Sequence, residues 1–180
     1  MDMGQLLTYF SFIKEYKKIK LLMIGAQSSG KTSILNQWKY NTILQTLPNN
    51  GIDIAQINYE NMEFQITVFS GKLNLNSLFS HCMETYEGLL IVIDSSNLQE
   101  KELLQSQLKT FFNKNEIQKI CPVLILANKS DKKKYQEDEI IKYIGIEKYR
   151  NKVHYQTFYT NCFSGEGLTD ALQWLYENYP

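Results

Sequence analysis

The sequence predicts an α/β fold in which a mostly parallel, six-stranded sheet is covered by helices on both faces. Three short and nearly continuous apolar runs, 20–24, 88–93 and 121–127, have the length and composition of strands that are buried on both faces. The segments between these runs include stretches with apolar residues at helical spacing. Strands that alternate with amphipathic helices in this way are typical of parallel sheets.

The first half of the chain adds one helix and a pair of strands to this prediction. Residues 32–40 follow the first apolar run and a glycine-rich loop, and they are predicted to form a helix. The stretches 52–59 and 62–69 have strand character, and apolar residues alternate with polar ones in the second of them. Glu60 and Asn61 lie between the two stretches and suit a hairpin turn.

The second half adds three helices and one strand. Apolar residues recur at helical spacing over 98–113 and again over 137–144, whereas 155–160 has the pattern of a weaker strand. A last helix carries one apolar stripe, formed by Leu168, Ala171, Leu172, Leu175 and Tyr176. Sheets of this kind bind ligands beyond the carboxyl ends of their strands, and each polar motif described below follows a predicted strand.

The composition fits a single intracellular domain. The 180 residues are 43% hydrophobic, which is enough to bury one core, and 19 basic residues balance 19 acidic ones. A net charge of zero argues against nucleic-acid binding. Cys82, Cys121 and Cys162 are odd in number and widely spaced, so they predict neither a disulfide framework nor a zinc site. No apolar run approaches the ~20 residues of a membrane span, and the first twelve residues lack the features of a signal peptide.

A glycine-rich loop lies between the first predicted strand and the first predicted helix. Its residues are Gly25, Ala26, Gln27, Ser28, Ser29, Gly30, Lys31 and Thr32. This is the G-x-x-x-x-G-K-[ST] pattern in the strand–loop–helix context that it requires. The N–H groups of Gln27 to Thr32 can point at phosphate oxygens, and the helix N-terminus adds a favourable dipole. In such a loop Lys31 reaches the outer phosphates and the Thr32 hydroxyl binds Mg²⁺, so the loop predicts a nucleoside phosphate site.

A second polar segment, Asn128-Lys129-Ser130-Asp131, follows the third buried strand. The Asp131 carboxylate can accept two hydrogen bonds from the N1–H and 2-amino edge of guanine, and adenine offers no such pair of donors. The stem of Lys129 can lie over the base plane, and Asn128 can brace the loop. An ordinary turn is the alternative for this tetrapeptide alone. After a phosphate loop, and at the end of a later strand, the segment favours a guanine site.

These motifs together resemble the Arf/Arf-like branch of the Ras-like small GTPases, over nearly the whole chain. Further segments similar to that family are Thr32 to Leu35, Leu47-Pro48, Gly88 to Ser95, Ser164 to Leu168 and Trp174-Leu175. The resemblance implies a Ras-like P-loop fold that binds GTP or GDP, with an N-terminal amphipathic helix over 1–17 and a GTP-binding domain over 18–180. We expect no catalytic residue. The resemblance implies nucleotide contacts at Gln27, Ser28, Ser29, Gly30, Lys31, Thr32, Ser33, Gly71, Asn128, Lys129, Asp131, Asn161 and Cys162. In that assignment Thr32 is also the metal ligand, and Cys162 contacts the base oxygen.

The chain departs from the family pattern at both switch segments. Asn49 stands where the family has a Thr that closes over Mg²⁺ and the γ-phosphate, and Val68 stands at the Asp of Asp-x-Gly-Gly-Gln. Val68 cannot accept a hydrogen bond from metal-bound water, so Mg²⁺ binding is expected to weaken. Lys72 replaces the Gln that orients the attacking water, and an ammonium has no acceptor for that water. Gly71 is kept, and its N–H can still meet a γ-phosphate. We expect very slow hydrolysis.

The N-terminus has two interpretations. Asp2 is incompatible with N-myristoylation, yet Met3 to Thr8 matches the acylation signal if translation begins at Met3. Leu6, Leu7, Phe10 and Ile13 can form one apolar face, which suits either a membrane or a protein surface. We favour a protein contact, because one acyl chain anchors only marginally.

The sequence therefore predicts a guanine-nucleotide-binding, Arf-like small GTPase with little or no hydrolysis, which serves as a partner-binding module in a larger cytoplasmic or ciliary assembly. Two alternatives stay open. The first is a regulated GTP/GDP switch in membrane or ciliary trafficking. The second is a P-loop fold retained as a structural subunit without nucleotide. A P-loop ATPase or nucleoside kinase is disfavoured by Asn128 to Asp131 and by the lack of a lid segment.

Overall fold

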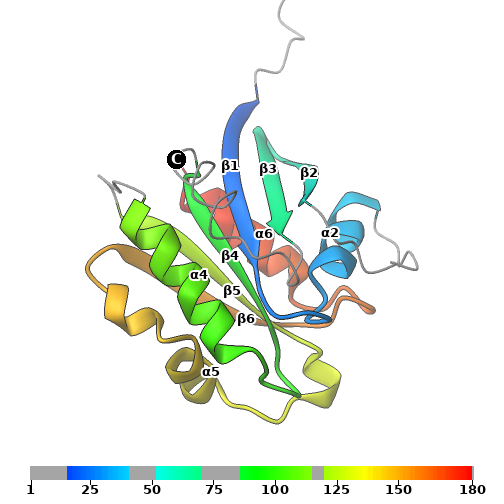
Figure 1. Cartoon of the computed structure of the whole chain (residues 1–180). Coiled ribbons are helices and arrows are strands. Elements are labelled where there is room, and N and C mark those ends of the chain that lie inside the picture. Colours follow the sequence, from blue (N-terminus) through cyan, green and yellow to red (C-terminus); the bar gives the residue numbers. More distant parts are fainter. Residues whose placement is uncertain (1–15, 41–51, 70–85, 115–119, 180) are drawn as a thin grey trace, which may run out of the picture.

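A computed structural model describes residues 16–40, 52–69, 86–114 and 120–179 of the chain. Six strands form one sheet in the order β2-β3-β1-β4-β5-β6 (Figure 1). The strands are β1 (Lys17–Ile24), β2 (Ile52–Tyr59), β3 (Met62–Phe69), β4 (Gly88–Asp94), β5 (Cys121–Asn128) and β6 (Val153–Thr160). The helices are α2 (Lys31–Tyr40), α4 (Lys101–Lys114), α5 (Glu137–Ile144) and α6 (Leu168–Glu177), with short 3-10 helices η2 (Ser130–Lys132) and η3 (Ile146–Tyr149).

Strand pairing brings the polar motifs to one edge of the sheet. β2 and β3 are antiparallel and are joined by the predicted turn at Glu60 and Asn61. All other pairings are parallel: β1 with β3 and β4, β4 with β5, and β5 with β6. The carboxyl ends of β3, β1, β4, β5 and β6 therefore lie at the same edge, which is where ligands bind in folds of this kind.

The sheet separates two apolar layers, because successive side chains of a strand point to opposite faces. On β1, Leu22 and Ile24 belong to the core cluster that contains the buried side chains of α4 and α5. Leu21 and Met23 belong to the second cluster, with the buried side chains of α2 and α6. Figure 1 shows α4 and α5 side by side on one side of the sheet. The predicted three-layer fold with a six-stranded, mostly parallel sheet is confirmed.

Three predicted starts are wrong by two residues or more. The first strand, predicted over 20–24, begins at Lys17, where it already pairs with Met62 of β3. The helix predicted over 98–113 begins at Lys101 instead, because Glu100 adopts a left-handed backbone conformation with φ 61°. Leu98 gave the apolar signal for an earlier start, and it contacts the core from the preceding loop. The last strand begins at Val153, two residues earlier than predicted, where it pairs with Cys121.

Several predictions fall on residues that the structure does not describe. These include most of the predicted helix 1–17, although β1 already begins at Lys17. They also include Asn49, Gly71 and Lys72.

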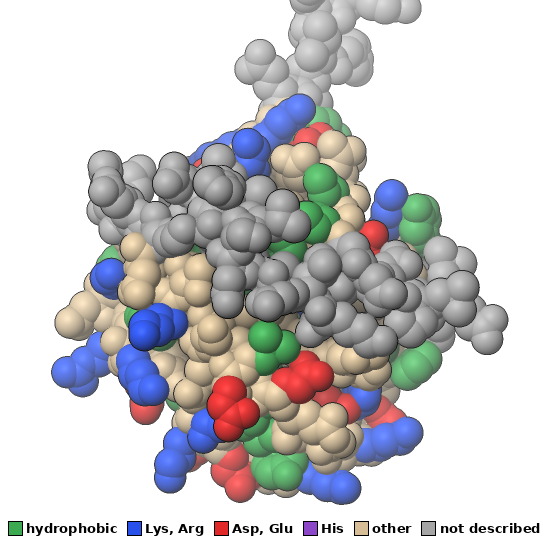
Figure 2. Space-filling model, in the orientation of Figure 1, with side chains coloured by type: hydrophobic (Ala, Val, Ile, Leu, Met, Phe, Trp, Pro, Cys, Tyr) green, Lys and Arg blue, Asp and Glu red, His purple; other side chains and the backbone are tan. Residues whose placement is uncertain are grey.

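Charged side chains are mixed on the surface. Figure 2 shows Lys and Arg side chains interspersed with Asp and Glu over the lower part of the visible face. This distribution agrees with the balance of 19 basic and 19 acidic residues. Within the described ranges, no helix is both long enough and apolar enough to cross a membrane.

Candidate nucleotide-binding site

The loop between β1 and α2 is closed tightly against neighbouring strands. Gly25 has φ +149° and Gly30 has φ +103°, conformations that residues with a side chain rarely adopt. A Cβ at Gly25 would lie 2.2 Å from the Val92 carbonyl oxygen, and one at Gly30 would lie 2.1 Å from Asn128 Nδ2. Both glycines are therefore required by close approach as well as by backbone conformation. The loop has the shape that allows backbone N–H groups to surround a phosphate.

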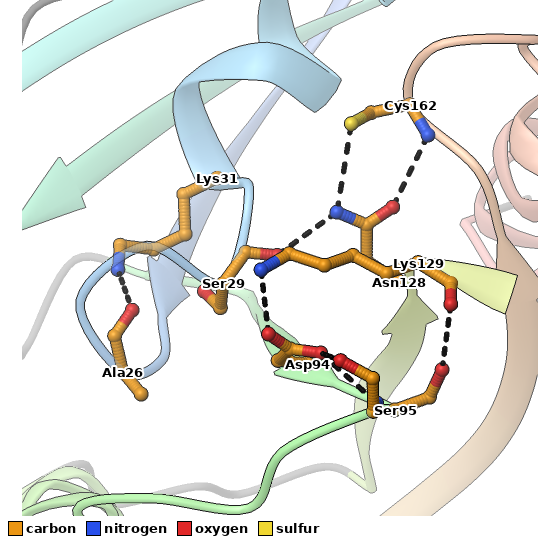
Figure 3. Close-up of polar contacts among 9 residues, drawn as sticks. Ala26, Ser29, Lys31, Asp94, Ser95, Asn128, Lys129 and Cys162 are labelled. Carbon is orange, nitrogen blue, oxygen red and sulfur yellow. Dashed lines mark hydrogen bonds and ion pairs between the residues drawn. The ribbon is translucent and has the colours of Figure 1, made fainter. Parts of the chain in front are cut away.

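Lys31 opens α2 and turns back over the loop (Figure 3). Its ammonium donates to the carbonyl oxygens of Gly25 at 2.7 Å and Ala26 at 2.8 Å. Burial lowers the pKa of Lys31 to about 8, and the nearby Glu100 carboxylate opposes part of that shift. A buried cation whose hydrogen bonds go to carbonyl oxygens is well suited to an anionic ligand, because a phosphate would compensate its lost hydration. Thr32 and Ser33 follow in the first turn of α2 and are half-buried.

Asn128, the last residue of β5, joins the phosphate loop to the loop after β6 (Figure 3). The side chain is fully buried. Its Nδ2 donates to the Ser29 carbonyl oxygen at 2.9 Å, and its Oδ1 accepts the Cys162 N–H at 3.1 Å. A weaker contact of 3.5 Å runs from the Thr160 hydroxyl to the same Oδ1. The predicted bracing role of Asn128 is thus visible as two hydrogen bonds to loops that lie far apart in the sequence.

Lys129 is held by an acidic residue that the sequence did not single out for the site. Its Nζ lies 2.5 Å from Asp94 Oδ2, at the end of β4 (Figure 3). Burial alone would raise the pKa of the Asp94 carboxyl, but hydrogen bonds from Lys129 and Ser96 outweigh burial and lower it. The Ser95 hydroxyl donates to the Lys129 carbonyl oxygen at 3.3 Å. Asp94 could have been identified as the first charged residue after a buried strand, the position shared by the other motifs.

Asp131 lies in η2 and is exposed to solvent. Asn161 Nδ2 donates to Asp131 Oδ1 at 3.2 Å, so the loops after β5 and β6 are linked at the surface too. The Asn161 side chain also accepts the Phe163 N–H at 2.9 Å. The N–H of Cys162 donates to Asn128, and a contact from Cys162 to a base oxygen stays a prediction.

Val68 lies near the carboxyl end of β3, beside the strand that leads into the phosphate loop. It pairs with Met23 of β1 and Asp53 of β2, and its side chain is 4% exposed within the core. An isopropyl group offers no acceptor to a metal or to metal-bound water. Among the residues that the structure describes, no group of three or more His, Cys, Asp or Glu could hold a metal ion. Of the described residues, the phosphate-loop pattern assigns Mg²⁺ to the Thr32 hydroxyl.

The chain is similar to known proteins over most of its length. Residues 6–179 match the model of the ADP-ribosylation factor family. ADP-ribosylation factor-like protein 1 of Caenorhabditis elegans is 28% identical over 174 residues, which are 96% of each chain. The protein of the same name from Drosophila melanogaster is 26% identical over the same length and share of each chain.

A solved structure shares the fold. It is the Arl6 BBS3 small GTPase of Trypanosoma brucei with bound nucleotide analogue GppNp, which matches with a TM-score of 0.75 and 22% identity. The match covers 90% of this chain and 97% of that one. Because the family model matches nearly the whole chain, the chain belongs to the ADP-ribosylation factor family and is an Arf-like small GTPase with a Ras-like P-loop fold.

Proposed function

We propose that the described site binds a guanine nucleotide through the residues that the sequence indicates. One observation carries this proposal: the buried Asn128 amide ties the phosphate loop to the loop after β6, so that one side chain aligns both halves of a nucleotide site. Lys31 and the N–H groups at the start of α2 would hold the phosphates. Asp131, at the opposite end of the site, would read the guanine edge.

Hydrolysis of the bound nucleotide is proposed to be very slow. Val68 is buried and apolar where the family has a carboxylate, so no side chain at that position can hold metal-bound water. The sequence adds Asn49 in place of the closing Thr and Lys72 in place of the water-orienting Gln. Catalysis of phosphoryl transfer rests on positioning and on charge neutralisation by the metal, and these changes affect both. Thr32 would then hold Mg²⁺ more weakly than the family pattern implies.

The physiological role that follows is a partner-binding module in a larger assembly. A switch must bind its partner with different affinities in two nucleotide states, since equal affinity shifts no equilibrium. Slow hydrolysis and weak metal binding make such a difference hard to maintain. A module that keeps one nucleotide as part of its fold has no such need. We propose a cytoplasmic or ciliary assembly, with the segment 1–17 as an amphipathic contact to protein.

Analysis of the native protein tests the nucleotide and the chemistry together. The protein is purified without added nucleotide, denatured, and its released ligand identified by chromatography. The expected ligand is GDP or GTP at close to one per chain. Single-turnover assays with loaded GTP are expected to show phosphate release far below that of an unaided small GTPase. Bound adenine nucleotide would contradict the guanine assignment, and release at an ordinary unaided rate would contradict impaired hydrolysis.

A regulated GTP/GDP switch is the second candidate, and membership of the ADP-ribosylation factor family favours it. The same hydrolysis assay separates the two roles. The N-terminus provides an independent test, because intact-mass measurement of the native protein reports whether Gly4 carries a myristoyl group. An unmodified Met1 or Asp2 would support the protein contact over a lipid anchor.

A further inference from the structure

The carboxylate of Glu100 reaches into the phosphate loop from the segment that follows β4. Its Oε2 accepts the N–H of Gln27 at 3.1 Å. Gln27 lies in the part of the loop whose N–H groups serve phosphate oxygens in the G-x-x-x-x-G-K-[ST] pattern. Glu100 is also the acidic residue whose charge acts on the buried Lys31 ammonium. The Glu100 carboxylate therefore accepts a hydrogen bond from a backbone donor of the loop. It also interacts electrostatically with Lys31, the cation that the pattern assigns to the outer phosphates.

The backbone around Glu100 is fixed from two helices. Glu100 precedes α4, and its carbonyl oxygen accepts the Leu104 N–H at 3.0 Å, which begins the helix. It does so with φ 61°, a left-handed conformation that is uncommon for Glu. The Tyr143 hydroxyl of α5 donates to the carbonyl oxygen of Gln99, next in the chain. Gln105 Nε2 of α4 in turn donates to the Tyr143 carbonyl oxygen at 3.0 Å. The backbone that carries the carboxylate is thus held at the contact between α4 and α5.

We propose that Glu100 makes the site select a nucleoside diphosphate over a triphosphate. This inference rests on the proposed guanine-nucleotide function and adds to it the state of the nucleotide. The outermost phosphate of a triphosphate adds negative charge at the outer end of the loop. The Glu100 carboxylate repels this added charge. It also competes with the outermost phosphate for the hydrogen-bond donors of the loop. A diphosphate lacks that group and meets less repulsion. The resident nucleotide is then GDP, bound directly from solution and not formed by hydrolysis within the site.

Two substitutions at one position separate charge from hydrogen bonding. Glu100→Ala removes both the charge and the acceptor, whereas Glu100→Gln keeps an amide oxygen that can accept the Gln27 N–H. Glu102→Ala is the matched control, because Glu102 is an exposed carboxylate two residues along the chain that does not act on Lys31. Affinities of the full chain for GDP and for a non-hydrolysable GTP analogue are measured by competition with a fluorescent GDP, and the ratio of the two is compared among variants.

The wild-type protein is expected to bind GDP more tightly than the GTP analogue. Glu100→Ala is expected to shift the ratio toward the analogue by about fivefold at low salt, and Glu100→Gln by about threefold, because its amide oxygen still competes for the Gln27 N–H. Added salt should reduce both shifts because exposed charges are screened. Glu102→Ala should shift the ratio by less than about twofold, because its charge is remote and solvated. An unchanged ratio in Glu100→Ala, or a Gln variant that behaves like wild type, overturns the inference while leaving guanine binding intact. A wild-type protein that binds neither nucleotide overturns the proposed function, and this inference with it.

Discussion

The carboxyl ends of β5 and β3 lie on opposite sides of the phosphate loop and carry opposite kinds of side chain. At the end of β5, Asn128 is polar, fully buried and hydrogen-bonded to two loops. Near the end of β3, Val68 is apolar, buried in the core and available for no polar contact. The first arrangement is costly unless every hydrogen bond is made, so its presence indicates a site that is still maintained. In the proposed function, Val68 leaves the metal side of the same site without an acceptor. Nucleotide binding is then kept on one side of the loop, while hydrolysis is impaired on the other.

The largest effect is expected on the β5 side, from Asn128→Ala. The substitution leaves the Ser29 carbonyl oxygen and the Cys162 N–H without their partners in a buried site. Two unsatisfied buried groups should lower the free energy of unfolding by about 4 kcal/mol. Guanine nucleotide affinity should fall with it, since the two loops are no longer joined. Urea unfolding and nucleotide titration measure both effects.

Asn58→Ala is the control for that substitution, because Asn58 is exposed on β2. A change below about 0.5 kcal/mol is expected there. If Asn128→Ala lowers the free energy of unfolding no more than the control does, the hydrogen bonds of Asn128 do not stabilise the site. The contrast between Asn128 and Val68 would then say nothing about nucleotide binding.

Val68→Asp tests the other side of the comparison. A carboxylate placed in a position that is 4% exposed should lower the free energy of unfolding by about 3 kcal/mol in metal-free buffer. Mg²⁺ with GDP should restore part of this stability if the position faces the metal region of the site, because a metal ion compensates a buried negative charge. Val68→Asn is the neutral counterpart and should gain less from Mg²⁺ with GDP, because it retains only the stabilisation from ligand binding at Thr32. Thermal unfolding with and without Mg²⁺ measures the difference. Equal gains in stability for the Asp and Asn variants would show that position 68 does not contact the metal.

The sequence predicts the fold further than it predicts the site. The strands 52–59 and 62–69 have the predicted bounds, because alternation and turn residues are local signals. The start of α4 was missed because Leu98 extends the apolar periodicity while a positive φ at Glu100 interrupts the helix. Periodicity reports burial, and it does not report the sign of a dihedral angle.

The contacts within the site show the same limit. The motif residues and the edge where they gather follow from strand order, because parallel strands end together. The pairs Lys129–Asp94 and Gln27–Glu100 join loops that are far apart in the sequence, and their existence depends on side-chain conformations. Of these two acidic residues, Asp94 alone could have been identified from the sequence, because it follows a buried strand. Glu100 gave none, since an acidic residue before a helix is ordinarily read as a favourable charge at its N-terminus.

A pH dependence should distinguish Lys31 from the other lysines. Burial lowers its pKa from the ordinary 10.5 to about 8, so the unfolded chain binds more protons than the folded protein between those two values. Protein stripped of nucleotide should therefore gain stability as pH rises from 8 to 10, by about 2 kcal/mol. Lys31→Met should remove this gain, and parallel curves for the two proteins would show that Lys31 is not the group responsible. Nucleotide affinity should change in the opposite direction, because phosphate requires the ammonium form.

The smallest effect is expected from Lys72→Gln, which restores the residue that orients water in the family. Val68 and Asn49 still lack the groups that hold the metal and close over the γ-phosphate, so the restored amide acts on a poorly neutralised phosphate. Single-turnover hydrolysis should rise by less than about threefold, a gain smaller than one hydrogen bond is typically worth. Val68→Asp combined with Lys72→Gln should exceed the product of the two single effects, because positioning of water and charge neutralisation depend on each other. A large gain in the hydrolysis rate from Lys72→Gln alone would mean that the β3 side of the loop still supports hydrolysis. Lys72 would then be the one residue that limits it.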